Sequence, residues 1–266
     1  DCCVGTRAAS QRERRFRVNV VIVRQIVFLC VWMVVFGCSD TQRDDVGSSR
    51  AVDEVPEDVW FVDQATERGL VFKYASGNEG RPLMPEIVGG GVAVLDVNND
   101  GNMDIYLVQA DFNLERGTAD QGSPSRLFVN QGEGYFKRQS NTGAEVRGYG
   151  LGVATGDYDN DGDADLYLAN YGPNVFYEND GTGIFADITK KTGTADKGWG
   201  THPAFIDYDN DGDLDLLVTN WLDENNVLYR NNGDGTFIDV SSSSGIFESG
   251  IGKTCWGTEF FDYDND

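Results

Sequence analysis

An acidic nonapeptide that occurs three times, with a fourth copy beginning at Asp262, is the part of this sequence best suited to chemistry. Its pattern is Asp-x-[Asp/Asn]-x-Asp-Gly-x-x-Asp, so positions 1, 3, 5 and 9 carry side-chain oxygens and position 7 can offer a backbone carbonyl. Glycine at position 6 permits a sharp turn with positive φ that folds these oxygens inward. Oxygen ligands on a flexible loop suit Ca²⁺, about one ion per complete loop. The candidate ligands are Asp96, Asn98, Asp100, Asn102 (backbone) and Asp104; Asp157, Asp159, Asp161, Asp163 (backbone) and Asp165; Asp207, Asp209, Asp211, Asp213 (backbone) and Asp215; and Asp262, Asp264 and Asp266.

Electrostatics favours a cation in these loops over a solvated acidic turn. The second and third loops each hold five Asp residues within nine positions, and like charges about 4 Å apart repel by about 1 kcal/mol even in water. A divalent cation converts that repulsion into cross-linking. Zinc or copper would require His or Cys ligands, whereas the chain has one His, His202, and no Cys near the loops.

The residues that follow each nonapeptide exclude an EF-hand. That motif needs an acidic ligand at position 12 and flanking helices, but position 12 here is Leu107, Leu168 or Val218. The exits are apolar runs rich in strand-forming residues. Each acidic loop is therefore predicted to join two β-strands.

A second repeated element alternates with the acidic loops and predicts the fold. Residues 127–136, 175–185 and 227–237 each contain a short apolar run, a Gly-rich turn and an aromatic residue that opens the next run, which is typical of a hairpin. Two hairpins per repeat make four strands, the content of one propeller blade. Because the loops recur at roughly fifty to sixty residues, an all-β propeller of about three to four blades is favoured over a β-sandwich.

Together these motifs resemble the FG-GAP/VCBS repeats of integrin-α-like β-propellers. The resemblance rests on Gly-Val-Ala before the acidic loop, on Leu-Tyr-Leu or similar runs after it, and on the stretch Leu228-Tyr-Arg-Asn-Asn-Gly-Asp-Gly-Thr-Phe237. Within that group the chain is most similar to exported bacterial proteins with an ASPIC/UnbV domain, relatives of cartilage acidic protein, because Trp60–Leu70, Pro85-Glu86 and Gly89-Gly-Gly91 also fit. The resemblance implies that the loop positions above ligate Ca²⁺, and Asn98 should weaken the first site.

The net charge of the chain limits the classes of partner expected for the folded part. The chain carries 44 acidic against 21 basic residues, a formal net charge of −23. Nucleic acids and anionic membrane surfaces need a basic face, so neither is an expected partner.

The N-terminal segment, residues 1–38, is predicted to be a processing signal. Several Arg residues precede the apolar run 26–36, which suits the core of a signal peptide better than a span of about 20 residues. Gly37-Cys38 resembles the lipobox of bacterial lipoproteins, so Cys38 would carry lipid; the alternative is a signal anchor over residues 18–36. Either form exports the remainder to the cell envelope, periplasmic or surface-exposed, with the membrane contacted only through this anchor.

Beyond the signal, residues 39–55 are polar and aperiodic, as expected for a tether, and residues 56–266 are predicted to form the propeller, truncated at its C-terminal end. Phe61-x-Asp63 matches the ends of later repeats although no acidic loop precedes it. We therefore expect Trp60–Leu70 to be an unpaired segment that supplies closing strand structure to another blade. Cys255 is the single cysteine of the body.

The predicted function is an exported, calcium-stabilised binding or scaffold module for a protein or glycan. A Ca²⁺-dependent polysaccharide lyase and a purely structural spacer are the alternatives. A Ser-His-Asp or Cys-His set cannot be assembled around the single His202, although a role for it as a base, next to Trp199, stays open. The aromatic-Gly pairs at residues 149–150, 199–200 and 256–257 are interpreted as packing between blades, with sugar binding as the alternative.

Overall fold

The structure of the chain is a computed structural model that describes residues 60–77, 80, 83–110, 124–145, 148–246 and 252–258. Contacts divide the chain into two units, Asp1–Trp60 and Phe61–Asp266, and every strand described below belongs to the second unit. The predicted signal, Cys38, the tether and the fourth acidic loop lie outside the described residues. Among the helices in the described ranges, none combines the length and the apolar character needed to cross a bilayer.

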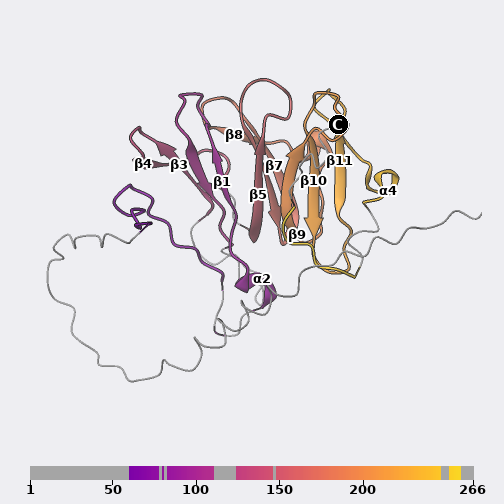
Figure 1. The fold of residues 1–266 in the computed structure, drawn as a ribbon, viewed down its shortest axis with the longest axis horizontal. Helices are drawn as coiled ribbons and strands as arrows, with labels where there is room; N and C mark the ends of the chain where they lie inside the picture. The colour runs from indigo at the N-terminus through magenta and orange to yellow at the C-terminus, as the bar shows by residue number, and fades with distance from the viewer. Residues whose placement is uncertain are drawn as a thin grey trace, which may run out of the picture. The chain divides into compact units, whose positions relative to one another are not determined.

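Three antiparallel sheets of four strands each follow one another along the chain (Figure 1). Within each sheet the strands are ordered as in the sequence, so every connection is a hairpin. The first sheet contains β1 (Val92–Leu95), β2 (Asp104–Leu107), β3 (Arg126–Asn130) and β4 (Phe136–Gln139). The second contains β5 (Gly150–Gly156), β6 (Asp165–Asn170), β7 (Gly172–Asn179) and β8 (Phe185–Asp187). The third contains β9 (Gly200–Ile206), β10 (Asp215–Asn220), β11 (Val227–Asn231) and β12 (Phe237–Asp239).

This arrangement confirms the all-β, propeller-type prediction, with three four-stranded blades among the described residues. The first strands of neighbouring blades contact each other, β1 with β5 and β5 with β9. Strands β6 and β10 are buried at all six positions. For β6 this follows because the second sheet has a neighbouring sheet on each face. By contrast, β1 alternates between exposed and buried residues.

The two larger clusters of the hydrophobic core form layers, each placed between consecutive sheets, and a third, smaller cluster contains Ala110, Tyr149 and Leu151. The first layer joins Leu95 and Tyr106 of the first sheet to Leu166 and Phe185 of the second. The second joins Tyr167 of the second sheet to residues of the third. Burying each such side chain contributes about 1.5–3 kcal/mol, so the blades are held to their neighbours and not to a common centre.

Two buried tyrosines illustrate how these layers satisfy polar groups. The hydroxyl of Tyr106 donates to the carbonyl of Ala144 at 2.5 Å, and that of Tyr167 donates to the carbonyl of Thr194 at 3.0 Å. Each acceptor lies just after the last strand of the same sheet. Since a buried hydroxyl without a partner is costly, these bonds fix the segment that leaves each blade.

The segment that leaves each blade contacts the outer strand of the next. Gly143 has φ 84°, and a Cβ there would lie 2.1 Å from the carbonyl oxygen of Phe185 in β8. The amide of Phe185 donates to the carbonyl of Thr142 at 2.6 Å. Only glycine permits this approach. The helices in the described ranges are single turns: α2 (Met84–Ile87), α3 (Thr189–Thr192) and α4 (Ser241–Ser244).

Residues 61–70 make the same contact with the first sheet. A Cβ on Gly69, at φ 86°, would lie 2.2 Å from the carbonyl oxygen of Phe136, and the Phe136 amide donates to Arg68 at 2.7 Å. Phe61 is 91% exposed and belongs to no strand. The segment therefore contacts the first sheet in the same way as the segment that leaves a blade contacts the next sheet. Among the described residues it pairs with no strand.

Candidate metal centre

All three described acidic loops occupy the same place in their sheets. They connect β1 to β2, β5 to β6 and β9 to β10, and the paired strands continue on both sides of each loop. This confirms that the nonapeptide joins two strands and not two helices. Because hydrogen bonds join neighbouring loops, the three lie together at one end of the sheets.

The side chain at position 1 organises the turn. In the second loop, Asp157 accepts the amides of Asp161 and Gly162, each at 3.0 Å. Gly162 has φ 95°, the positive value expected at position 6. Asp96 and Asp207 accept the corresponding amides of their own loops at 2.7–3.1 Å. The loop backbone is therefore wound around its first carboxylate.

The carboxylate at position 9 lies at the base of each loop and is buried. Asp165 is 1% exposed, and it accepts the amide of Tyr158 at 3.2 Å and that of Asn179 at 2.9 Å. Asp104 and Asp215 are each 0% exposed and accept amides from equivalent positions. Each therefore ties its loop to the third strand of the same sheet.

Carboxylates at positions 1, 3 and 9 converge in the second and third loops. Each of Asp157, Asp159 and Asp165 can offer one oxygen such that these atoms lie within 4.8 Å of one another, and Asp207, Asp209 and Asp215 form the equivalent group. Position 5 lies outside both groups: Asp161 and Asp211 instead accept the amides of position 7 at 2.9 and 3.0 Å. These triplets could hold a metal ion.

The negative charge of the carboxylate triplets is partly desolvated and is not paired with a basic residue in the described ranges. Desolvation raises the pKa of Asp165 to about 7, although hydrogen bonds from Asn179 and Tyr158 oppose the shift. Desolvation likewise raises the pKa of Asp215 and that of Asp159. The ion pair found in the described ranges joins Lys191 to Glu178, so no Lys or Arg there pairs with the triplets.

The first loop has the same backbone and a different set of side chains. Asn98 at position 3 leaves two carboxylates, Asp96 and Asp104, at the converging positions. The amides of Asn98 and Asn102 donate to Asp100 at 3.2 and 3.0 Å. A hydrogen bond from the Asn102 backbone is the largest of the influences that lower the pKa of Asp100. Side-chain amides of this loop therefore stabilise the charged form of Asp100.

The chemistry of the donors fits a hard divalent cation. The triplets offer carboxylate oxygens alone, and His202 lies in β9, outside both groups. The remaining predicted ligands, Asp262, Asp264 and Asp266, lie outside the described residues, as does Cys38.

Sequence reasoning missed two sets of asparagines that support the loops. Asn179 and Asn231 end the third strands of their blades, and each donates its side-chain amide to the loop of the preceding blade. Asn99 and Asn160, at position 4, donate to the following loop. The available signal was the recurrence of Asn at both places in every copy of the motif.

Aromatic residues gather at the opposite end of the sheets. Trp199, just before β9, stacks on Trp221, just after β10, with ring centroids 4.2 Å apart and planes at 18°. Tyr171 of the second sheet contacts Trp199 at 5.1 Å, and Trp256 contacts Trp221 at 4.9 Å. The rings pack on one another across blades, which supports the packing interpretation of the aromatic-Gly pairs.

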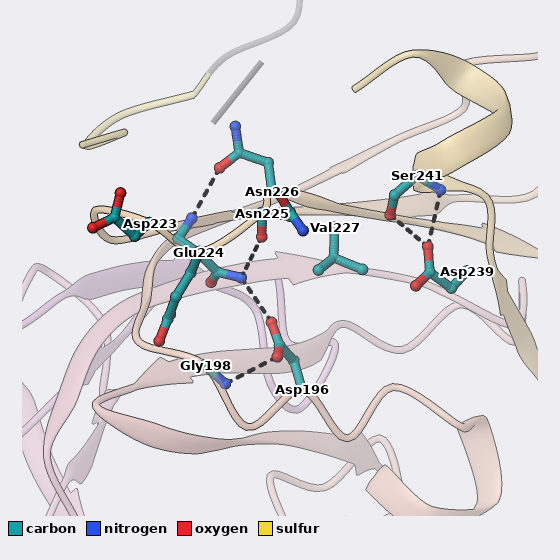
Figure 2. Close-up of a pocket in the computed structure, with 10 residues that line it drawn as sticks. Asp196, Gly198, Asp223, Glu224, Asn225, Asn226, Val227, Asp239 and Ser241 are labelled. Carbon is teal, nitrogen blue, oxygen red and sulfur yellow. Dashed lines mark hydrogen bonds between the residues drawn. The ribbon is translucent and has the colours of Figure 1, made fainter. Parts of the chain in front are cut away.

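Beside these rings is a polar pocket of about 370 Å³ in the third sheet (Figure 2). Asp196 accepts the amide of Gly198 at 3.0 Å, and Asp239 accepts the amide of Ser241 at 2.9 Å. Figure 2 shows the Asp223 carboxylate directed away from Asp196. Equivalent residues of the second sheet, including Asp187 and Thr189, line a similar pocket. A pocket at this place therefore occurs in both the second and the third blade.

Fold and loops together define a class: a β-propeller whose blades carry an acidic, metal-type loop between the first and second strands. Residues 96–168 and 157–218 match the family of FG-GAP-like repeats. Each match begins at position 1 of an acidic loop and ends in the second strand of the next blade. Over residues 96–218 the chain is therefore similar to FG-GAP-like repeats. No curated protein matches the chain in sequence.

Proposed function

We propose that this protein is an exported, calcium-stabilised β-propeller that serves as a binding or scaffold module for a protein or glycan at the cell envelope. The observation that carries the proposal is the convergence of three carboxylates, one of them buried, in each of two successive loops. Such loops repel themselves when empty, and a propeller end built from them requires a cation to be rigid.

Calcium is the cation that this donor set suits best. It takes six to eight oxygen ligands from carboxylates, carbonyls and water, and it tolerates irregular geometry. In the second loop Asp157, Asp159 and Asp165 would hold it, together with the position 7 carbonyl of Asp163 that the family resemblance assigns. Bound calcium supplies countercharge to the triplet. Weak sites, with Kd of about 10⁻⁴–10⁻³ M, are sufficient for extracellular modules.

We further propose that the module is not an enzyme. His202 is half-buried in β9, and desolvation lowers its pKa. None of the hydrogen bonds found in the described ranges involves its imidazole, so a partner that would orient it as a base is lacking there. These features support a packing role for the ring.

Export and anchoring are part of the same proposal. The basic residues, the apolar run 26–36 and Gly37-Cys38 support lipidation of Cys38, with a signal anchor as the other form. The opening stretch from Trp60 supports the finer assignment to the ASPIC/UnbV group. Intact mass of protein extracted from membranes tests the anchor: a mature chain that begins at Cys38 with added acyl mass is the expected result.

The binding function is tested by a protein and glycan array probed with the whole chain, with calcium or with EDTA. Binding to one class of ligand that is lost in EDTA, and lost in a double variant Asp159→Ala/Asp209→Ala, would support the proposal. The matched control is Asn98→Ala, which alters the first loop and should retain binding. An array without calcium-dependent ligands would contradict the binding role, and release of unsaturated sugars from a polysaccharide would indicate a lyase.

A further inference from the structure

Side-chain amides connect each acidic loop to the next. The Nδ2 group of Asn99 in the first loop donates to Oδ1 of Asp163 in the second at 2.6 Å. The Nδ2 group of Asn160 in the second loop donates to Oδ1 of Asp213 in the third at 2.8 Å. Both bonds run from position 4 of one loop to position 7 of the following one. The same contact thus occurs at two successive blade junctions.

The backbone at position 4 adopts an uncommon conformation that directs this amide outward. Asn99, Asn160 and Asn210 have φ of 55°, 59° and 58°, in the left-handed region that asparagine tolerates better than most residues. All three are exposed. Position 4 follows position 3, so an ion that orders position 3 also orders the adjacent asparagine.

The receiving side chain is confined on a second side. A Cβ on Gly181, in the β7–β8 turn, would lie 2.6 Å from Oδ2 of Asp163, and a Cβ on Gly233, in the β11–β12 turn, would lie 2.7 Å from Oδ2 of Asp213. Each carboxylate at position 7 is therefore held between an asparagine of the preceding blade and a glycine turn of its own blade. Holding this side chain also positions the position 7 carbonyl.

A reciprocal amide bond closes each junction. Nδ2 of Asn179 donates to the carbonyl of Val97 in the first loop at 3.0 Å, and Nδ2 of Asn231 donates to the carbonyl of Tyr158 in the second at 2.8 Å. The backbone amide of Asn179 also donates to the buried Asp165. Two bonds of opposite direction thus join neighbouring loops, one from an exposed and one from a buried asparagine.

We propose that Asn99 and Asn160 are positioning residues that couple cation binding in one loop to cation binding in the next. This inference rests on the proposed calcium function. An ion in the second loop orders Asp159, hence the adjacent Asn160, hence Asp213 and its carbonyl in the third loop. By linkage, an ion in the third loop favours binding in the second to the same extent. The loops then load cooperatively.

The test is hydrogen exchange of the whole chain, in mild detergent, over a calcium titration. Peptides covering residues 157–165 and 207–215 report each loop separately through the amides that their position 1 carboxylates accept. Asn160→Gly removes the amide and keeps a residue that accepts positive φ. Since one solvent-exposed hydrogen bond is removed, we expect the calcium concentration that protects residues 207–215 to rise about threefold to tenfold, and the Hill coefficient to fall towards one.

Two further variants separate coupling from a general structural effect. Asn160→Asp keeps the shape but places a carboxylate against Asp213, so its shift should exceed that of Asn160→Gly. Asn210→Gly is the matched control, because it makes the same change at the same φ, while no described residue accepts a hydrogen bond from the Asn210 side chain. It should leave residues 157–165 and 207–215 unshifted. Circular dichroism at saturating calcium confirms that all variants keep the fold.

The outcomes are distinct. Unchanged protection of residues 207–215 in Asn160→Gly, or an equal shift in Asn210→Gly, would overturn the coupling while calcium binding stands. If calcium protects neither loop of the parent chain, both this inference and the proposed function fail.

Discussion

The three described acidic loops have the same backbone conformation, but the first differs from the other two in the side chains that surround its carboxylates. In the first, the side-chain amides of Asn98 and Asn102 donate to Asp100 and so stabilise its negative charge. In the second, carboxylates occupy both of those positions, Asp159 and Asp163, and burial raises the pKa of Asp159. The comparison indicates that turn geometry is set by positions 1, 5, 6 and 9, and we expect dependence on an ion to be set by position 3.

The largest expected effect is that of calcium itself. Two sites at one hundred times their Kd stabilise by about 2.7 kcal/mol each, and a domain of this size gains roughly 2–4 °C per kcal/mol. We therefore expect 10 mM calcium to raise the melting temperature by about 10 °C or more over EDTA, measured by scanning calorimetry. Equal melting temperatures in both buffers would contradict the expectation that the second and third loops depend on an ion.

Substitutions at position 3 should act in opposite directions in the two kinds of loop. Asp209→Ala removes repulsion towards Asp207 and Asp215, so in EDTA the variant should be as stable as the parent or slightly more so, while it loses about half of the calcium-induced shift. Asn98→Ala removes a donor to Asp100 and should lower stability in EDTA by about 0.5 kcal/mol. Denaturant unfolding in each buffer measures both. Loss of stability in EDTA for Asp209→Ala would show that repulsion is not what the ion relieves.

A single exchange should convert the first loop to the behaviour of the others. Asn98→Asp replaces an amide donor with a third converging carboxylate beside Asp96 and Asp104. We expect about 0.5–1 kcal/mol lower stability in EDTA and an additional calcium-dependent gain, since like charges several ångströms apart now need a counterion. Asn102→Ala, outside the converging positions, is the control. A variant whose calcium response equals that of the parent would mean that position 3 does not decide ion dependence.

The smallest effect on stability is expected from a tyrosine substitution that is detected by spectroscopy. Position 2 is tyrosine in the second and third loops, Tyr158 and Tyr208, and is Val97 in the first. Among the three described loops, bound Tb³⁺ should therefore be excited through tyrosine in the second and third. Tyr208→Phe should reduce this emission by about half with stability unchanged to about 0.5 kcal/mol, as for most surface substitutions. Emission that persists in full would place the lanthanide elsewhere.

Much of this fold follows from local patterns. The apolar runs around each acidic loop predict the β5–β6 and β9–β10 hairpins, and the Gly-rich turns predict the pairing of β7 with β8 and β11 with β12. The positive φ at Gly162 follows from its place in the motif. These features succeed because hairpins are closed by residues that are near in sequence.

Features that depend on neighbouring blades could not be predicted in the same way. The bond between Asn99 and Asp163 links residues 64 positions apart, and nothing in the first loop alone indicates its partner. The sequence also predicts a ligand at position 5, where one oxygen of Asp161 accepts the amide of Asp163. A nonapeptide specifies which oxygens it has, and the packing of blades decides where they point.

The stacked indoles of Trp199 and Trp221 give the molecule an optical property of its own. Two indoles that lie face to face at 4.2 Å share their electronic excitation, and a chiral placement splits it into circular-dichroism bands of opposite sign. One ring precedes β9 and the other follows β10, so the band pair exists only while these strands remain together at the end away from the acidic loops. The loss of this band pair during unfolding reports when that end of the blade separates, without any added label. Comparison with the loss of lanthanide emission from the acidic loops would show which end of the blade unfolds first.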